Sequence, residues 1–436
     1  MASPTKTLIT GQTISFMADP FVAPPEEALV HRRHGGVLVA EGRIAAVGEA
    51  DDLRAANPGV AEQAWDDKIV SAAFVDCHNH YSQTAIIASW GKRLIDWLET
   101  YTFPEEMRFG DPAYANRIAE RYLDLLVDNG IASAAAYCTI HPESVDALFA
   151  AAESRNMRMT AGKVMMDRNA PAGLRDSAQA GYDQSKALIE RWKGRGRLTY
   201  AVTPRFAPTS TPEQLEAAGA LWAQYPDLVM QTHLSEQTEE IDWVRRLFPD
   251  DDDYLAVYQR FGLCGPGAIM GHAIHLTERE RAALSETGAA VAHCPTSNAF
   301  IGSGLCNVEG LKAAGVITGL ATDIGGGSSF SMLATMRSAY EIGQLRGDAL
   351  HPAQLWWLAT QGSADVMRLG DRIGGLSVGR EADLVILDPA ATPVLEQRLE
   401  MAGSIDEILF ALIVLGDDRC IAETYLAGDP AKKGRS

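Results

Sequence analysis

The chain has 436 residues, of which 47% are hydrophobic and 22% charged, a composition typical of a globular enzyme and unlike that of a disordered chain. With 57 acidic against 38 basic residues the formal net charge is −19, so polyanions such as nucleic acids and anionic membrane surfaces are not expected as partners. The length exceeds that of a single core unless the fold is a barrel of roughly 250 residues or more, which predicts one large domain and a smaller one.

The lack of an expected secretory signal and the use of cysteines together predict a cytoplasmic protein. Residues 1–16 contain no basic segment followed by an apolar run, so a secretory signal is not expected. The longest strongly apolar run, residues 408–415, is much shorter than the ~20 helical residues that cross a bilayer. The six cysteines form no Cys-x-x-Cys pair, which favours free thiols in a reducing compartment over a disulfide framework or a cysteine zinc site.

Both ends of the chain are rich in strand-like segments. Residues 7–15 and 36–48 predict strands and a hairpin, residues 384–387 a further strand, and residues 425–428 the close of the small domain. Neither end is long enough to hold a core alone, so we expect them to pair. The predicted domains are a small β-sandwich built from residues 1–68 plus 375–436, and a catalytic domain of residues 69–374.

The middle of the chain alternates between β-type runs and helical stretches. Alternation of this kind predicts a parallel sheet, and eight β/α units predict a closed (β/α)8 TIM barrel. Two further helices, residues 331–345 and 352–367, then lead back to the small domain. The predicted barrel strands are residues 69–75, 131–137, 157–166, 198–203, 228–232, 268–270, 289–292 and 316–321, and the helices between them include residues 111–128, 144–154, 179–193, 212–222 and 278–285.

The first predicted barrel strand is followed by two histidines one residue apart, His78 and His80. Because side chains along a strand alternate with a period of two, both imidazoles are expected on one face. A pair of histidines aimed the same way resembles half of a metal site, but a bare His-x-His is a weak motif. A metal site would therefore need further ligands from residues at the ends of other strands.

Barrel enzymes carry their chemistry at the carboxyl ends of the strands, and these ends supply the partners. His233 and Glu236 follow strand five, His272 ends strand six and Asp323 follows strand eight. Imidazole nitrogens and one carboxylate make a mononuclear site for zinc or a similar divalent ion, which raises the acidity of bound water. In that site Asp323 could take the proton of the water, Glu236 could pass a proton to the substrate, and His272 could hydrogen-bond the attacking water.

Other polar residues near the strand ends leave alternatives open. His272 is preferred over His275 because it falls at the strand end, while His293, at the end of strand seven, fits a pocket role and a purely structural role equally well. Lys163 could in principle be a carbamylated bridging ligand, but it lies on strand three, whereas Arg205 occupies the strand-four position. One metal ion is therefore expected.

The arrangement of His-x-His, His, His and Asp at these strand ends resembles the amidohydrolase superfamily, whose barrel is flanked by a small β domain. The resemblance extends across most of the chain. Within the superfamily, four longer stretches look like the guanine deaminase family and are more specific than His-x-His alone: residues 97–106 (WLETYTFPEE), 162–167 (GKVMMD), 293–298 (HCPTSN) and 323–327 (DIGGG).

The resemblance implies hydrolytic deamination of guanine to xanthine and ammonia by a cytoplasmic homodimer that binds one zinc ion per subunit. A small purine is the implied partner: an Arg donor suits its carbonyl oxygen, a Gln amide can donate and accept at ring nitrogens, and a Phe ring can stack on the base. The implied roles are zinc binding by His78, His80, His233 and Asp323, proton transfer by Glu236 with His272 and Asp323, and purine binding by Gln83, Arg205 and Phe206.

Two other functions compete with this interpretation. A related amidohydrolase that deaminates or dechlorinates another heterocycle, such as 8-oxoguanine or a triazine, would use the same metal ligands; Gln83 and the Arg205-Phe206 pair argue against it. A catalytically silent barrel kept as an assembly module is the second alternative. The complete set of metal and proton-transfer residues argues against that reading.

Overall fold

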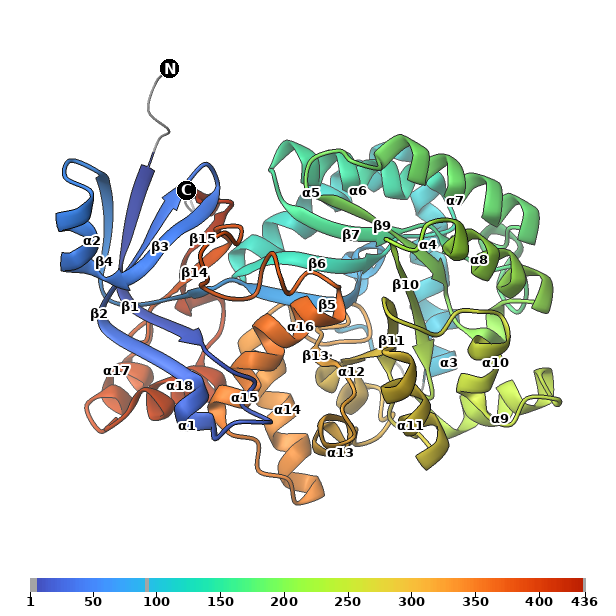
Figure 1. Ribbon diagram of the computed structural model, residues 1–436. Coiled ribbons are helices and arrows are strands. Elements are labelled where there is room, and N and C mark those ends of the chain that lie inside the picture. Colours follow the sequence, from blue (N-terminus) through green and yellow to red (C-terminus); the bar gives the residue numbers. More distant parts are fainter. Residues whose placement is uncertain (1–5, 91–93, 434–436) are drawn as a thin grey trace.

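The computed structural model describes residues 6–90 and 94–433 and has two parts. In Figure 1 the blue strands from the start of the chain and the red strands from its end lie together in one sheet. The rest of the chain forms a parallel barrel surrounded by helices. The predicted combination of a (β/α)8 barrel with a small β domain from both chain ends is confirmed.

The small domain contains a seven-stranded mixed sheet in the order β16-β15-β14-β4-β1-β2-β3. Strand β1 pairs antiparallel with β2 and parallel with β4, and β14 pairs antiparallel with β4. The hydrogen-bond ladder is continuous, so the predicted sandwich is more accurately one mixed sheet. Its strands are β1 (Lys6–Phe16), β2 (Leu29–Ala40), β3 (Arg43–Glu49), β4 (Ala61–Ala72), β14 (Leu384–Leu387), β15 (Ile421–Leu426) and β16 (Asp429–Pro430).

The barrel strands run parallel in the order β5-β6-β7-β9-β10-β11-β12-β13, with the short β8 beside β9. All of them overlap the predicted strands, although β5 does so only at Phe74 and Val75. These strands are β5 (Phe74–His80), β6 (Ile131–Tyr137), β7 (Arg158–Gly162), β8 (Val164–Met165), β9 (Leu198–Pro204), β10 (Val229–Leu234), β11 (Ala268–His272), β12 (Ala290–His293) and β13 (Thr318–Leu320).

The predicted first barrel strand, residues 69–75, is divided between two elements. Its first residues belong to β4 of the small sheet, which runs past the predicted domain boundary to Ala72, and the barrel strand β5 begins at Phe74. Between them, Ala73 donates its N–H to the Asp383 carbonyl at 3.0 Å. Both strands are buried here, so the apolar run carried no mark of the change from one sheet to the other.

The buried carboxylate of Asp76 bridges the gap between β5 and β13, the first and last strands of the barrel. Asp76 Oδ1 accepts the N–H of Thr322 at 3.0 Å, and Oδ2 accepts from Asn79 Nδ2 at 2.8 Å and from the Thr322 hydroxyl. The N–H of Asp323 donates to the His78 carbonyl at 3.0 Å. Burial raises the pKa of Asp76 to about 6, although these hydrogen bonds act to lower it. This side chain therefore connects the two strand ends that carry His78 and Asp323.

The helices begin at side-chain caps close to the predicted positions. The side chains of Asp111, Ser177, Thr211 and Ser331 each accept a main-chain N–H at the start of a helix, which satisfies donors that have no partner within the helix. The barrel helices are α5 (Pro112–Asp128), α6 (Pro142–Ser154), α7 (Ala178–Trp192), α8 (Pro212–Gln224), α9 (Thr238–Leu247), α10 (Tyr254–Arg260), α11 (Glu278–Thr287), α12 (Pro295–Phe300), α13 (Val308–Ala313) and α14 (Met332–Arg346).

The remaining helices lie in the connections of the small sheet, after the barrel strand β5, or after α14. The predicted helix 352–367 is interrupted by a π-helical segment, Leu358–Gly362, which separates α15 from α16. Helices α17 and α18, which lie between β14 and β15, were not predicted. These helices are α1 (Pro25–Ala28), α2 (Ala50–Ala56), α3 (Leu94–Trp97), α4 (Phe103–Glu106), α15 (Pro352–Trp357), α16 (Ser363–Val366), α17 (Pro393–Leu399) and α18 (Ile405–Leu415).

A buried ionic cluster joins the barrel to the segment that enters β14. Arg158 in β7 donates from Nε to Glu381 at 2.8 Å, and Arg197 donates from Nε to the same carboxylate at 2.8 Å and also pairs with Asp383. The two arginines share the Glu381 carboxylate, so removing Glu381 would leave Arg158 buried without its acidic partner. Over residues 6–90 and 94–433, no helix has both the length and the apolar character needed to cross a membrane.

Candidate metal centre and substrate pocket

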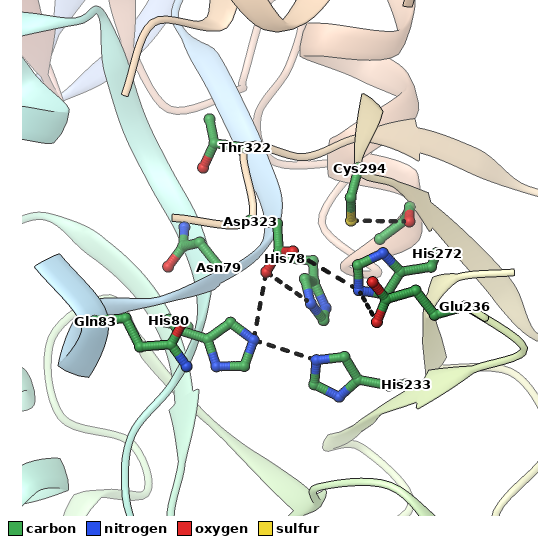
Figure 2. A network of polar contacts seen from close by, with 12 residues as sticks. His78, Asn79, His80, Gln83, His233, Glu236, His272, Cys294, Thr322 and Asp323 are labelled. Atoms are coloured by element: carbon green, nitrogen blue, oxygen red, sulfur yellow. Dashed lines mark hydrogen bonds and ion pairs between the residues drawn. The ribbon is translucent and has the colours of Figure 1, made fainter. Parts of the chain in front are cut away.

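Four elements bring the predicted ligands together at the carboxyl end of the barrel. His78 and His80 lie in β5, His233 lies near the end of β10, His272 is the last residue of β11, and Asp323 lies in the loop after β13. Figure 2 shows the four imidazole rings and the Asp323 carboxylate pointing toward one another. His78, His80, His272 and Asp323 are buried, and His233 is partly buried.

The spacing of the ligand atoms fits a four-coordinate metal ion. Asp323 Oδ1 lies 3.5 Å from His78 Nε2 and 3.4 Å from His80 Nε2, and His80 Nε2 lies 3.2 Å from His233 Nε2. Ligands about 2.0 to 2.1 Å from a tetrahedral zinc ion are about 3.3 to 3.4 Å apart. The residues therefore suit a divalent ion of this size.

A hydrogen bond to the main chain fixes which ring nitrogen of His233 faces the other candidate ligands. His233 Nδ1 lies 2.7 Å from the Arg205 carbonyl oxygen, which can only accept, so Nδ1 carries the proton and Nε2 presents a lone pair. Among the described residues, neither ring nitrogen of His78 nor Nδ1 of His80 has a hydrogen-bond partner. Buried polar atoms without partners are costly, and a metal ion would satisfy those that face the centre.

The electrostatic environment keeps the ligands in their metal-binding forms. Burial lowers the pKa of His78, and it lowers the pKa of His80 and His233 strongly, so these imidazoles are neutral at physiological pH. Burial alone would raise the pKa of Asp323, but its close approach to the His78 and His272 rings outweighs burial and holds the pKa below its ordinary value. Neutral imidazoles and an ionised carboxylate are the forms that bind a divalent cation.

Glu236 and His272 form a polar pair beside the ligands. His272 Nε2 lies 3.6 Å from Glu236 Oε2 and 3.7 Å from Asp323 Oδ2, and its Nδ1 lies 2.9 Å from Asn298 Oδ1. Ser303 donates its hydroxyl to Glu236 Oε1 at 2.7 Å. Burial raises the pKa of Glu236, so this carboxyl group binds a proton more readily than an exposed glutamate does.

The backbone at these strand ends has unusual conformations. Ser235, His272 and Asp323 have φ values of 48°, 68° and 49°, in the left-handed region that costs energy for residues other than glycine. Gly271 must be glycine because a Cβ there would lie 2.6 Å from Cε1 of His78. Backbone strain and close packing of main chain on side chains are therefore concentrated where the candidate ligands meet.

A pocket opens from the ligand cluster, with an empty volume of about 420 Å³ that includes solvent at its mouth. The predicted substrate residues Gln83, Arg205 and Phe206 all line it, so the structure brings them to the same cavity as His80, His233, Glu236, His272 and Asp323. Its apolar wall contains Leu94, Trp97, Leu98, Phe206 and Ile301.

Sequence reasoning overlooked several residues that support the site. Glu106 is 1% exposed and accepts hydrogen bonds from both Gln83 and Arg205, while Asn298 and Ser303 hold His272 and Glu236. Glu106 and Asn298 fall inside the stretches that resemble the guanine deaminase family, which was the only signal available. Ser303 carried no signal, because its partner is 67 residues away.

Four other residues are not counted in the ligand cluster. His275 Nε2 contacts the Ser303 carbonyl at 2.8 Å, and His293 lines a separate small cavity with Cys306. Lys163 Nζ is held by Asp176 and the Val164 carbonyl. Cys294 lies near His78, His272 and Asp323, but its thiol donates to the Ala292 carbonyl at 3.4 Å and burial raises its pKa well above the ordinary value.

Comparisons with known proteins identify the family of the chain. The pattern of the Amidohydrolase family matches residues 69–431, and that of an imidazolonepropionase-like composite domain from bacteria matches residues 35–59. The guanine deaminase of Escherichia coli (strain K12) is 44% identical over 408 residues, which cover 93% of each chain.

Solved structures extend the comparison to the whole fold. The structure of E. coli guanine deaminase has a TM-score of 0.95 at 42% identity and covers 98% of this chain and 99% of its own. Guanine deaminase from C. acetobutylicum, solved with guanine bound in its active site, has a TM-score of 0.88 at 27% identity, with the same coverage. This chain therefore belongs to the amidohydrolase family and, within it, groups with the guanine deaminases.

Proposed function

We propose that this protein catalyses the hydrolytic deamination of guanine to xanthine and ammonia. The observation that carries the proposal is that the ligand cluster opens directly into a pocket lined by Gln83, Arg205 and Phe206. A metal centre, an acidic group able to transfer a proton, and donors and acceptors for a planar base therefore meet in one cavity. The similarity to guanine deaminases supports the same substrate.

We propose one zinc ion per subunit, held by His78, His80, His233 and Asp323. The distances between these ligand atoms, from 3.2 to 3.5 Å, support the assignment. When bound, the ion would supply the Lewis acidity that makes water a nucleophile near neutral pH.

The protein's own side chains would manage the protons of the reaction. Asp323 accepts the proton of the attacking water, while His272 hydrogen-bonds the water oxygen and directs it at the amino-bearing ring carbon. Glu236, whose carboxyl is protonated more readily than usual, gives a proton to the neighbouring ring nitrogen. A proton delivered to the amino group then allows the C–N bond to break, ammonia leaves, and the new C–O bond gives xanthine.

Three side chains would hold the base in the pocket. Arg205 donates to the purine carbonyl oxygen, Gln83 meets a ring nitrogen, and the Phe206 ring contacts the base. All three are buried, so their polar contacts would form away from bulk water, where a missing partner is costly.

Ammonia release by the purified, zinc-loaded protein tests the reaction. Guanine should be preferred over adenine, cytosine, 8-oxoguanine and melamine, and a chelator should abolish the activity. Activity on melamine or 8-oxoguanine alone would be consistent with the proposed metal centre but would show that guanine is not the substrate. Zinc-loaded protein that is silent on all five compounds would reject the proposed function.

We also propose that the enzyme acts as a homodimer in the cytoplasm. The resemblance to its family supports the dimer. All six cysteines are free, as expected in a reducing compartment.

A further inference from the structure

Glu106 lies between the two polar side chains that would hold the purine. It ends helix α4, whereas Gln83 follows β5 and Arg205 follows β9. Glu106 Oε1 accepts from Gln83 Nε2 at 2.9 Å, and Glu106 Oε2 accepts from Arg205 NH1 at 2.7 Å. The three side chains are 1 to 3% exposed, so each of these contacts is sheltered from water.

The chemistry of this contact determines the orientation of the Gln83 amide. A carboxylate paired with a guanidinium accepts hydrogen bonds through both oxygens, and Glu106 is paired in this way with Arg205. Gln83 must therefore turn its NH2 group toward Glu106, which leaves Oε1 for the pocket.

The backbone beside Gln83 leaves room for its side chain. A Cβ at Gly325 would collide with Gln83 Oε1, and Gly325 has a φ of 113°, which other residues rarely adopt. The carbonyl oxygen of Gln83 thus packs closely on a glycine of the loop that carries Asp323. The amide is held on one side by a carboxylate and on the other by main chain.

We propose that Glu106 is a positioning residue that makes Gln83 present a hydrogen-bond acceptor to the substrate, so that the pocket selects bases carrying a ring N–H at that point. The inference rests on the proposed deamination of guanine, whose rings carry such N–H groups. Glu106 does not touch the base. It acts through Gln83 and also holds the Arg205 guanidinium in place.

The variant Glu106→Gln tests the role because it reverses the amide while preserving shape. Arg205 still needs an acceptor, so the introduced amide turns its oxygen toward Arg205 and its NH2 toward Gln83. Gln83 must then rotate and present its own NH2 to the pocket. Glu105→Gln is the matched control, because Glu105 is also buried but pairs with Tyr114 and Arg108 outside the pocket.

The measurements are kcat and KM for guanine, 1-methylguanine and 9-methylguanine with zinc-loaded enzyme, and the Kd of xanthine by calorimetry. In Glu106→Gln we expect the KM of guanine and the Kd of xanthine to rise on the order of tenfold or more, with zinc content unchanged. One of the two methylated bases will be the poorer substrate of the wild-type enzyme. The ratio of kcat/KM for guanine to kcat/KM for that base should fall by a similar factor in Glu106→Gln. Glu105→Gln should leave these values near those of the wild type.

An unchanged KM, or an unchanged preference for guanine over that methylated base, would overturn the role of Glu106, since shape alone would then read the ring. If Glu106→Gln loses zinc or unfolds, Gln83→Met carries the test: it removes the acceptor, leaves Glu106 and Arg205 paired, and should give the same loss of preference. Wild-type enzyme that releases no ammonia from guanine would instead reject the proposed function.

Discussion

His233 Nδ1 donates to the main-chain carbonyl of Arg205 across 2.7 Å, while the Arg205 side chain faces the pocket. One residue thus orients a proposed metal ligand through its backbone and a proposed substrate contact through its side chain. A shift of the loop after β9 would disturb both functions together.

Replacing His233 with Ala should remove the metal and the activity together. The change deletes one of the four proposed ligands and leaves His80 Nε2 without the neighbour that lies 3.2 Å away. Zinc content by mass spectrometry and ammonia release check the result, with His34→Ala, on the exposed surface, as the control. Activity surviving in metal-free protein would defeat the ligand assignment.

Glu236→Gln should keep the metal and lower kcat on the order of a hundredfold or more, because the amide cannot transfer a proton. The hydroxyl of Ser303 can still donate to the amide oxygen, so the side chain should stay in place. Zinc content and steady-state kinetics test this, beside the exposed control Glu213→Gln. Near-normal turnover would mean that another group moves the proton.

Arg205→Ala should weaken guanine by about ten- to a hundredfold in kcat/KM, the loss expected for a hydrogen bond from a charged donor. It should affect 2-aminopurine, which lacks the carbonyl oxygen, much less. Arg205→Lys is the matched variant, because it retains a cationic partner for Glu106. Equal losses for guanine and 2-aminopurine would show that Arg205 does not read the oxygen.

The stability of the protein should depend on pH through Glu240. Burial, with repulsion from Glu236, raises the pKa of Glu240 from 4.5 to about 7. The folded chain therefore binds a proton more tightly than the unfolded chain, so the stabilisation is complete below pH 4.5 and is lost as pH rises through 7. The amount is about 3 kcal/mol of unfolding free energy at most.

The variant Glu240→Gln isolates this effect. Its amide oxygen can accept the N–H groups of Glu236 and Gln237, and its NH2 can face the Tyr254 hydroxyl, so the local hydrogen bonds are retained. Urea unfolding of zinc-saturated protein at pH 5 and pH 7.5 should show wild type losing stability relative to the variant as pH rises. A difference that is the same at both pH values would contradict the assignment.

Much of the fold and of the candidate site could be predicted from the sequence because these features are local. A buried parallel strand is a short apolar run, and a polar residue at its carboxyl end faces the mouth of a barrel. His233 and His272 were therefore placed in the site by their positions after such runs. The one strand misplaced, residues 69–75, failed because two buried strands follow each other without a polar break.

By itself, the sequence determined the alternation of strands and helices, the pairing of the two chain ends in a small β domain, and the residues at the strand ends. Only the tertiary structure decided what stands behind them: Asp76 bridging to Thr322, 246 residues away, and Glu106 meeting Gln83 and Arg205, 23 and 99 residues away. Such partners follow no local period, because a hydrogen bond between distant segments depends on how the barrel closes and not on the residues that flank it.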